Sequence, residues 1–240
     1  MIRFFRTIRQ NLLAQGRITR YLAYAIGEIV LVMVGILLAL QVNNWNDSRK
    51  RARLEEATLK ELRTNLLVDI KDFKEDMRIY GIVSRSAAIL IDFIDGAIPY
   101  HDSLNVHFGN VPAQGVFTPN KAAYENLKAT GIDLISNDTL RAALSDLYEG
   151  RYHYMQGYMD TEYQFDHQTF GDYYLKEMKE YDFFRSAVPV DPERLIGDQH
   201  LRNLITHRKQ KLEGWFKRQF EISIRQAEKV IEMIDKELAP

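Results

Sequence analysis

Two hydrophobic patterns divide this chain. Residues 22–42 are almost continuously apolar, and Glu28 is the single ionisable residue among them. After residue 45, apolar residues instead recur every three or four positions, as they do in helices that bury one face. We therefore expect an all-α protein with one N-terminal transmembrane helix, followed by an elongated antiparallel helical bundle.

The apolar run has the length of a membrane crossing. As a helix rising about 1.5 Å per residue, it spans about 30 Å, the thickness of the hydrocarbon core of a bilayer. If Glu28 instead lay in water, the remaining residues 29–40 would cover only about 18 Å. A cleavable signal peptide is the competing interpretation, but its apolar region is normally about 7–15 residues long. The run here is longer and ends in "LALQVNNWN", a poor cleavage site, so we predict a retained transmembrane helix over residues 21–45.

Glu28 is expected on a face of this helix that suits packing. Gly35 follows Glu28 by seven residues and therefore lies almost in line with it, and Gly27 and Ala39 flank the same face. An acid inside a bilayer is costly unless protein or water meets it. We expect Glu28 to contact a partner helix, either bonded to a copy of itself or paired with a base on another subunit. In the alternative, Glu28 reaches the N-terminal headgroups from a lipid-facing monomer.

Polar and aromatic residues at both ends of the run suit the membrane surface. We expect the aromatic side chains of Tyr21, Tyr24 and Trp45 to act as interfacial anchors. Residues 1–20 form a basic tail with an amphipathic pattern. The arginines predicted to contact lipid headgroups there are Arg3, Arg6 and Arg9.

The orientation follows from which side is harder to translocate. Lys and Arg tie at five on each flank of the run over twenty residues. Long domains cross largely regardless of charge, whereas a short arginine-rich tail stays inside. We therefore expect a cytoplasmic tail in the inner membrane, with residues 46–240 as an extracytoplasmic, periplasmic bundle.

The body is expected to contain three long helices and a shorter one. The first shows a heptad pattern of apolar residues at Leu59, Leu62, Leu66, Ile70, Phe73, Met77 and Tyr80. Two further helices are predicted from residues 137–138 towards Glu180 and over residues 198–238. A shorter helix is predicted to begin at Thr118 and Pro119 and to end at Gly131. Long helices joined by breaks at residues 96–120 and 185–198 favour a bundle.

The composition excludes several kinds of site. The chain has no cysteine, which excludes disulfides, zinc–thiolate sites and a cysteine nucleophile. The net charge of -1 argues against nucleic acid as a partner. The acids and histidines of one helix, His153, Glu162, Asp166 and His167, have the wrong spacing for a di-iron bundle, and no HExxH motif occurs. We therefore expect no metal, no cofactor, no catalytic residues and no enzymatic activity.

Aromatic residues concentrate between Tyr148 and Phe184, which hold twelve of the chain's 27. One interpretation is an aromatic-lined ligand pocket between helices, in which Tyr152, Tyr158 and Phe165 take part. The other, which we favour, is a bundle core that places tyrosines at its solvent edge.

Two blocks of the sequence resemble an uncharacterised family of single-pass inner-membrane proteins common in Bacteroidota. The first comprises "FFRTIRQNLL" and "YLAYAIGEIVLVMVGILLALQVNNWND", and the second is "FTPNKAAYENLKATGIDLISNDTLRAALSDLY". The first block carries the specific pattern IGEIxLVxxGILLALQxNNWN, with Glu28 and Trp45 in place. The resemblance implies a membrane protein of unknown function, and it transfers no activity or catalytic residue.

The leading functional interpretation is therefore a membrane-anchored interaction or structural protein. It would assemble through its membrane helix, as a homo-oligomer or as an accessory subunit of a larger complex in the cell envelope. The alternative is an extracytoplasmic ligand-sensing bundle, for which a small-molecule ligand in the aromatic region is required.

Overall fold

The computed structural model describes residues 18–115, 117–182 and 184–239, with side chains from Leu22 onward. The basic tail, and with it Arg3, Arg6 and Arg9, lies outside the described residues. The chain divides into two compact units, Met1–Leu54 and Glu55–Pro240. Helix α2, Ile18–Ile94, contributes residues to both units. It is continuous over this length because no proline interrupts it and its glycines are isolated.

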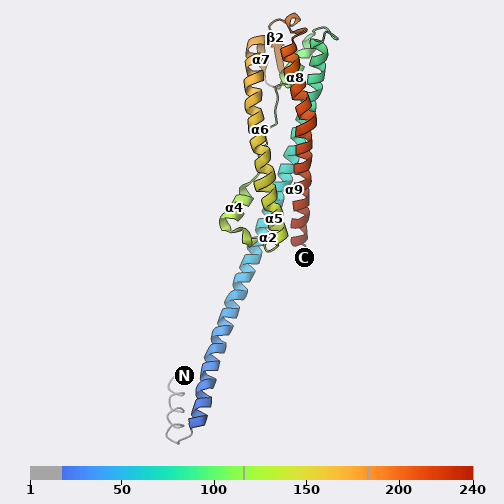
Figure 1. Ribbon diagram of the computed structural model, residues 1–240. Helices are drawn as coiled ribbons and strands as arrows, with labels where there is room; N and C mark the ends of the chain where they lie inside the picture. The colour runs from blue at the N-terminus through green and yellow to red at the C-terminus, as the bar shows by residue number, and fades with distance from the viewer. Residues whose placement is uncertain (1–17, 116, 183, 240) are drawn as a thin grey trace. The chain divides into compact units, whose positions relative to one another are not determined.

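Three long helical segments build the unit Glu55–Pro240 (Figure 1). The first is the part of α2 that ends at Ile94. The second is a continuous helical segment whose five successive parts are α5 (Asp138–Ser145), the π-helical turn η3 (Asp146–Tyr152), α6 (His153–Asp166), the π-helical turn η4 (His167–Gly171) and α7 (Asp172–Glu177). The third has three parts: α8 (Gln199–Lys211), the π-helical turn η6 (Leu212–Phe216) and α9 (Lys217–Glu237).

Polar contacts at one end of this unit fix the directions of the three segments. Arg63, in α2, pairs with Asp235 near the end of α9, with Nε and Oδ1 2.5 Å apart. Asn137, the N-cap residue of α5, donates to Glu237 at the end of α9. The third segment is therefore antiparallel to the first two, which run in the same direction. The predicted helical body is confirmed.

Shorter elements connect the long ones. They are η1 (Asp102–Leu104), α3 (Asn105–Asn110), α4 (Ala122–Thr130), η2 (Ile132–Leu134), β1 (Met178–Asp182), β2 (Ser186–Pro189) and η5 (Glu193–Leu195). The two strands pair as an antiparallel hairpin that the sequence pattern did not predict. The hairpin packs on α3, where a Cβ atom added to Gly109 would lie 2.5 Å from the backbone nitrogen of Ser186. Only glycine permits this approach, because any side chain would collide with the strand backbone.

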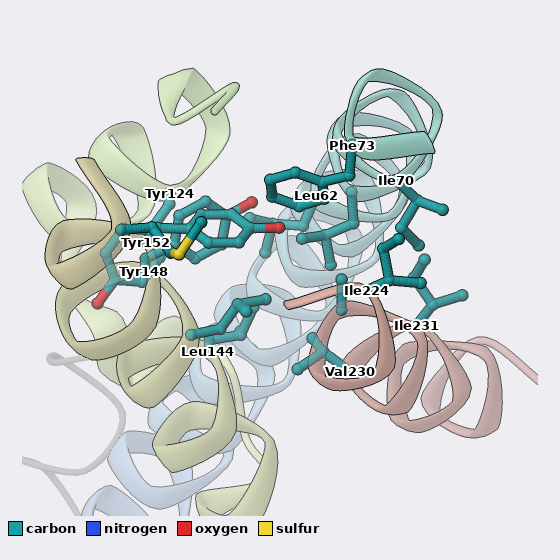
Figure 2. Packing of buried hydrophobic residues seen from close by; sticks show 14 of the residues in the cluster. Leu62, Ile70, Phe73, Tyr124, Leu144, Tyr148, Tyr152, Ile224, Val230 and Ile231 are labelled. Carbon is teal, nitrogen blue, oxygen red and sulfur yellow. The ribbon is translucent and has the colours of Figure 1, made fainter. Parts of the chain in front are cut away.

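The predicted heptad positions of α2 form the core. Leu59, Leu62, Leu66, Ile70, Phe73 and Tyr80 are buried, and Met77 is partly buried. Figure 2 shows Leu62, Ile70 and Phe73 of α2 facing side chains of the second and third helical segments. The Phe73 ring stacks on Phe117 with the ring centroids 4.9 Å apart. The heptad pattern predicted for α2 is thus confirmed as core, and the third helical segment buries apolar residues such as Leu212, Phe220 and Ile234 in the same core.

Residues 113–115 and 117–120 return along the bundle as extended chain, which we name the extended segment. Ala113, Gly115 and Phe117 are buried at the two-residue spacing of an extended backbone, whereas Val111 and Pro112 form a turn at the end of α3, in which Val111 has helical φ and ψ of −58° and −38°. At about 3.3 Å per residue, against 1.5 Å in a helix, the extended segment covers a given distance with about half the residues. A Cβ atom on Gly115 would lie 2.5 Å from Oδ1 of Asp76, so a side chain at this position would displace the Asp76 carboxylate.

Arg208 of α8 bonds to the backbone of the turn at the end of α3 and of the extended segment that follows it. Its side chain is only 3% exposed, and it donates to the carbonyl oxygen of Val111 at 2.6 Å and also to that of Ala113. The guanidinium forms an ion pair with Asp166 of α6, whose Oδ2 also accepts from Gln114 at 3.0 Å. An extended segment without a neighbouring strand has no ladder to satisfy its carbonyls, so Arg208 takes that place.

The extended conformation also moves the start of the next helix. Helix α4 begins at Ala122, so the predicted start at Thr118 and Pro119 is wrong. The backbone N–H of Asn120 donates to Oδ1 of Asp69 at 2.8 Å, which holds the chain extended up to that residue. The predicted end at Gly131 is confirmed, with φ of 112° and an N–H bond to the carbonyl of Leu127.

We predict that Arg208→Met lowers the free energy of unfolding by about 3–5 kcal/mol, because it removes the positive partner of the Asp166 carboxylate and leaves two backbone carbonyls without their donor. Arg202→Met is the matched control in the same helix, since Arg202 pairs with Asp95 at the surface, with side chains 37% and 42% exposed. An exposed pair contributes at most about 1 kcal/mol. Urea unfolding of the full chain in a neutral detergent measures both variants, and equal losses would contradict the role assigned to Arg208.

Candidate functional site

The apolar half of α2 is the most exposed hydrophobic surface of the described chain. Within the described residues, α2 is the helix whose length and apolar composition suit a membrane crossing, near the N-terminus. Over residues 29–42 its large apolar side chains are between 48% exposed, at Val34, and 68% exposed, at Leu31. Soluble monomers rarely expose a contiguous apolar surface of this kind, so lipid or another protein must cover it.

The face predicted for helix packing is open. A Cβ atom added to Gly27 or Gly35 meets no atom within 4 Å, and Ala39 is exposed. Glu28 is partly buried and takes part in an interaction of its own. The small residues therefore leave room for close approach of another helix, while the pairing of Glu28 with a partner stays a prediction.

Trp45 has the surroundings of an interfacial residue. Its ring is 61% exposed, and the guanidinium of Arg49 lies 4.9 Å from the ring centroid. A cation over an indole ring is a favourable contact where apolar and polar surfaces meet. Tyr24 is partly buried, and the side chain of Tyr21 lies outside the described residues.

The structure does not bring the three aromatic residues of the predicted ligand pocket together. Tyr152 is fully buried in the core and contacts Phe73 edge-on, with the ring centroids 5.8 Å apart. Tyr158 stacks on Trp215 at a centroid distance of 3.6 Å, and Phe165 is 41% exposed. Figure 2 shows Tyr148 and Tyr152 pointing from the second helical segment into the core.

A different set of aromatics, from the same helical segment and from β1, lines a cavity of about 320 Å³. We name it the aromatic cavity. Its lining includes Tyr163, Phe170, Tyr174 and Tyr181, together with His167 of the π-helical turn η4. The volume lies at the lower end of the range for small-molecule sites.

Two buried acids of α2, Asp69 and Asp76, adjoin the extended segment at Asn120 and Gly115. Asp69 is 3% exposed, and its second oxygen, Oδ2, is buried without a hydrogen-bond partner among the described residues. Burial raises the pKa of Asp69 to about 6, against the bond from the N–H of Asn120, which lowers it. Burial likewise raises the pKa of Asp76 to about 6, and the charges of Asp72 and Glu75 add to this. Both acids therefore reduce the stability of the fold when they ionise.

These buried charged residues were missed in the sequence, although a signal exists. Arg208 lies in register with Leu201, Ile205 and Leu212, and Asp69 lies between Leu66 and Phe73 of the heptad pattern. A charged residue on an otherwise apolar helix face is a sign of a buried polar contact, because charged residues are seldom fully buried unless paired.

Three of the four acids and histidines considered as metal ligands in the second helical segment have protein partners, and the fourth, His153, is exposed. Glu162 pairs with Lys211, Asp166 with Arg208, and the His167 ring stacks with Tyr163 at 6.3 Å. In the part of the chain that the structure describes, no three His, Asp or Glu side chains form a group suited to a metal ion.

The chain belongs to a family of unknown function (DUF6090), whose family model matches residues 28–207. This confirms the expectation of an uncharacterised family. The match includes Glu28 and extends through the extended segment and the second helical segment into α8. No curated protein and no solved structure matches the chain.

We predict that Asp69→Asn stabilises the protein at pH 7.5 and not at pH 4. The folded-state pKa of about 6 exceeds the ordinary value of 3.8, so the wild type loses stability as the pH rises from about 4 to 6. The amide can still accept the Asn120 bond and has no charge to bury, so its gain at pH 7.5 is about 2–3 kcal/mol. Urea unfolding across this pH range tests it, with Asp92→Asn on an exposed position of α2 as control. A gain that is independent of pH would contradict the assignment.

Proposed function

We propose that this protein is a membrane-anchored interaction protein that assembles through the apolar half of α2. The helix that packs against this half of α2 is a second copy of the same helix or a helix of another subunit in a cell-envelope complex. The observation that carries the proposal is the uncovered apolar surface of residues 29–42, with an acid at its N-terminal end and two open glycine positions. A protein with only an anchoring role would need apolar residues there and no acid.

The position of Glu28 supports helix association. Counted from the middle of residues 22–42, Glu28 is about 6 Å towards the N-terminal side, inside the hydrocarbon core. A carboxyl group at that depth is stabilised by a hydrogen bond across an interface, and the adjacent glycines allow backbones to come close enough for one.

The proposed location is the inner membrane, with the N-terminus in the cytoplasm and the helical body in the periplasm. The arginine-rich tail supports this orientation, because short basic segments remain on the cytoplasmic side. The absence of cysteine is compatible with an oxidising compartment.

A second candidate function is ligand sensing by the body, favoured by the aromatic cavity of about 320 Å³. A metabolite that binds there would raise the melting temperature of the full chain in detergent. The Gly171→Met variant is the test, because Gly171 lines the cavity and a methionine side chain would occupy it. Stabilisation that survives in this variant would exclude the aromatic cavity as the binding site.

We predict that Glu28→Leu inserts more easily than the wild type, by about 2 kcal/mol or more, and fails to assemble. Glu28→Gln separates two roles, because it keeps the hydrogen bond and removes the possible charge. A neutral structural Glu28 tolerates this change, whereas an ion-paired one does not. Crosslinking in native membranes and blue-native electrophoresis measure assembly, with Met33→Leu as an apolar control in the same helix. Unchanged assembly in both Glu28 variants would show that the Glu28 side chain does not contribute to the interface.

We predict that alkaline phosphatase fused after Pro240 is active in bacterial cells, since this reporter folds only outside the cytoplasm. A fluorescent reporter restricted to the cytoplasm should stay dark at the same position. The reverse result would place the body in the cytoplasm and invert the proposed orientation.

A further inference from the structure

We propose that a second hollow of the body binds a small organic anion that has a phosphate or carboxylate head and a short apolar chain. The hollow, which we name the basic cavity, has a volume of about 520 Å³ and lies between α2 and the third helical segment. None of its lining residues lines the aromatic cavity. The proposal does not depend on the function proposed above.

Two local features open the basic cavity. Gly81 lies on its wall in the interior of α2, where a glycine costs about 1 kcal/mol relative to alanine. A Cβ atom added there would meet only the Nη1 atom of Arg85, at 3.5 Å. The glycine is therefore not required by a close backbone contact, and its missing side chain leaves open space in the cavity. On the opposite wall, Leu212 and Glu213 belong to the π-helical turn η6, which widens the helix at the level of the cavity. Such single π-turns are frequent at functional sites.

The charge of the lining is positive, although the whole chain has a net charge of -1. Arg78 is already bound to Glu75, and Glu213 to Lys209, by ion pairs at 2.6 and 2.9 Å. The remaining lining charges in the described chain are three cations, Lys74, Arg85 and Lys217, and one acid, Glu221. None of the three cations forms an ion pair with a described residue, so they are available to an anion.

Ser84 gives an independent indication of a ligand. It lines the basic cavity, is 7% exposed, and its hydroxyl oxygen is buried without a hydrogen-bond partner among the described residues. A buried hydroxyl that lacks a partner costs free energy. If the Ser84 side chain rotates towards the cavity, an oxygen of a bound phosphate or carboxylate accepts a hydrogen bond from this hydroxyl and removes that cost.

The wall between the charges is apolar. Met77 and Leu212 line the cavity beside the buried Tyr80. This combination suits a ligand with one anionic head and a short hydrocarbon body better than a fully polar anion, because the body would displace water from apolar surface.

Hexyl phosphate is the probe, titrated into the full chain in a neutral detergent at constant ionic strength. The Trp45→Phe background leaves Trp215, in the turn η6, as the single tryptophan to report binding by fluorescence. We expect saturable binding of hexyl phosphate, binding of inorganic phosphate weaker by at least about tenfold, and no binding of hexylamine. Equal binding of hexylamine, or no saturable signal with hexyl phosphate, would overturn the proposal.

Matched variants locate the site. Lys217→Gln and Arg85→Gln should each weaken hexyl phosphate binding about tenfold, whereas Lys229→Gln, exposed on the same helix as Lys217 but outside the cavity, should not. Gly81→Met fills the hollow and should abolish binding. Persistent binding in Gly81→Met would indicate partition into detergent and overturn the proposal.

Ser84→Ala distinguishes a ligand contact from a structural effect. It removes an unsatisfied buried hydroxyl, so it should raise the melting temperature of the ligand-free protein and lower the affinity for hexyl phosphate. An unchanged affinity would show that Ser84 does not face the ligand, and would overturn its part in the site.

The anionic head can come from a soluble metabolite or from a lipid. Repeating the titration in nanodiscs distinguishes the two sources of the same chemistry. Equal affinity in phosphatidylcholine and phosphatidylglycerol discs supports a soluble anion. Competition in phosphatidylglycerol discs alone supports occupancy of the basic cavity by an anionic lipid headgroup.

Discussion

An extended chain can pass through a helical bundle only if its peptide groups find partners, and here the guanidinium of Arg208 is the main partner. Helices satisfy their own backbone, but the described residues of the extended segment between α3 and α4 belong to neither a helix nor a strand. Arg208 has five donors in a planar fork, and it uses them on the carbonyls of Val111 and Ala113 and on Asp166. Lysine, with one compact ammonium group, does not offer the same geometry. The positions of α3, α6 and α8 relative to one another follow from this contact.

The long helices could be predicted from the sequence because each has an apolar stripe with helical period. The heptad pattern of α2 and the stripe of the third segment correspond to buried positions almost residue by residue. The extended segment could not be predicted, because an alternation of Ala113, Gly115 and Phe117 is short and its partners are distant in sequence. Arg208 lies 97 residues from Val111. The hairpin β1–β2 was missed for the same reason, since its fit depends on Gly109 in a distant helix.

The candidate site also has features that the sequence alone indicates and features that it does not. The membrane-crossing length and the acid at Glu28 are local properties, and the sequence alone indicates both. The lining of the aromatic cavity, in contrast, cannot be derived from one short stretch of the sequence. The concentration of aromatics between Tyr148 and Phe184 is evident in the sequence, but the residues that line the cavity, such as Phe170 and Tyr174, differ from Tyr152, Tyr158 and Phe165. Which aromatic faces the core depends on the helical phase, and the π-helical turns η3 and η4 change that phase within one helical segment.

The π-helical turns have a further consequence for how hollows arise in this fold. A π-turn holds one residue more than the α-helical turn it replaces, so the flanking helix can continue on either side while its cross-section widens locally. Both cavities lie at such turns: η4 contributes to the aromatic cavity and η6 to the basic cavity. Insertion or deletion of a single codon in such a turn therefore creates or closes a hollow at a fixed depth of the bundle, and leaves the helices on both sides intact. Members of the family that differ by one residue at η4, which lies within the matched residues, would differ in this cavity before they differ in their fold.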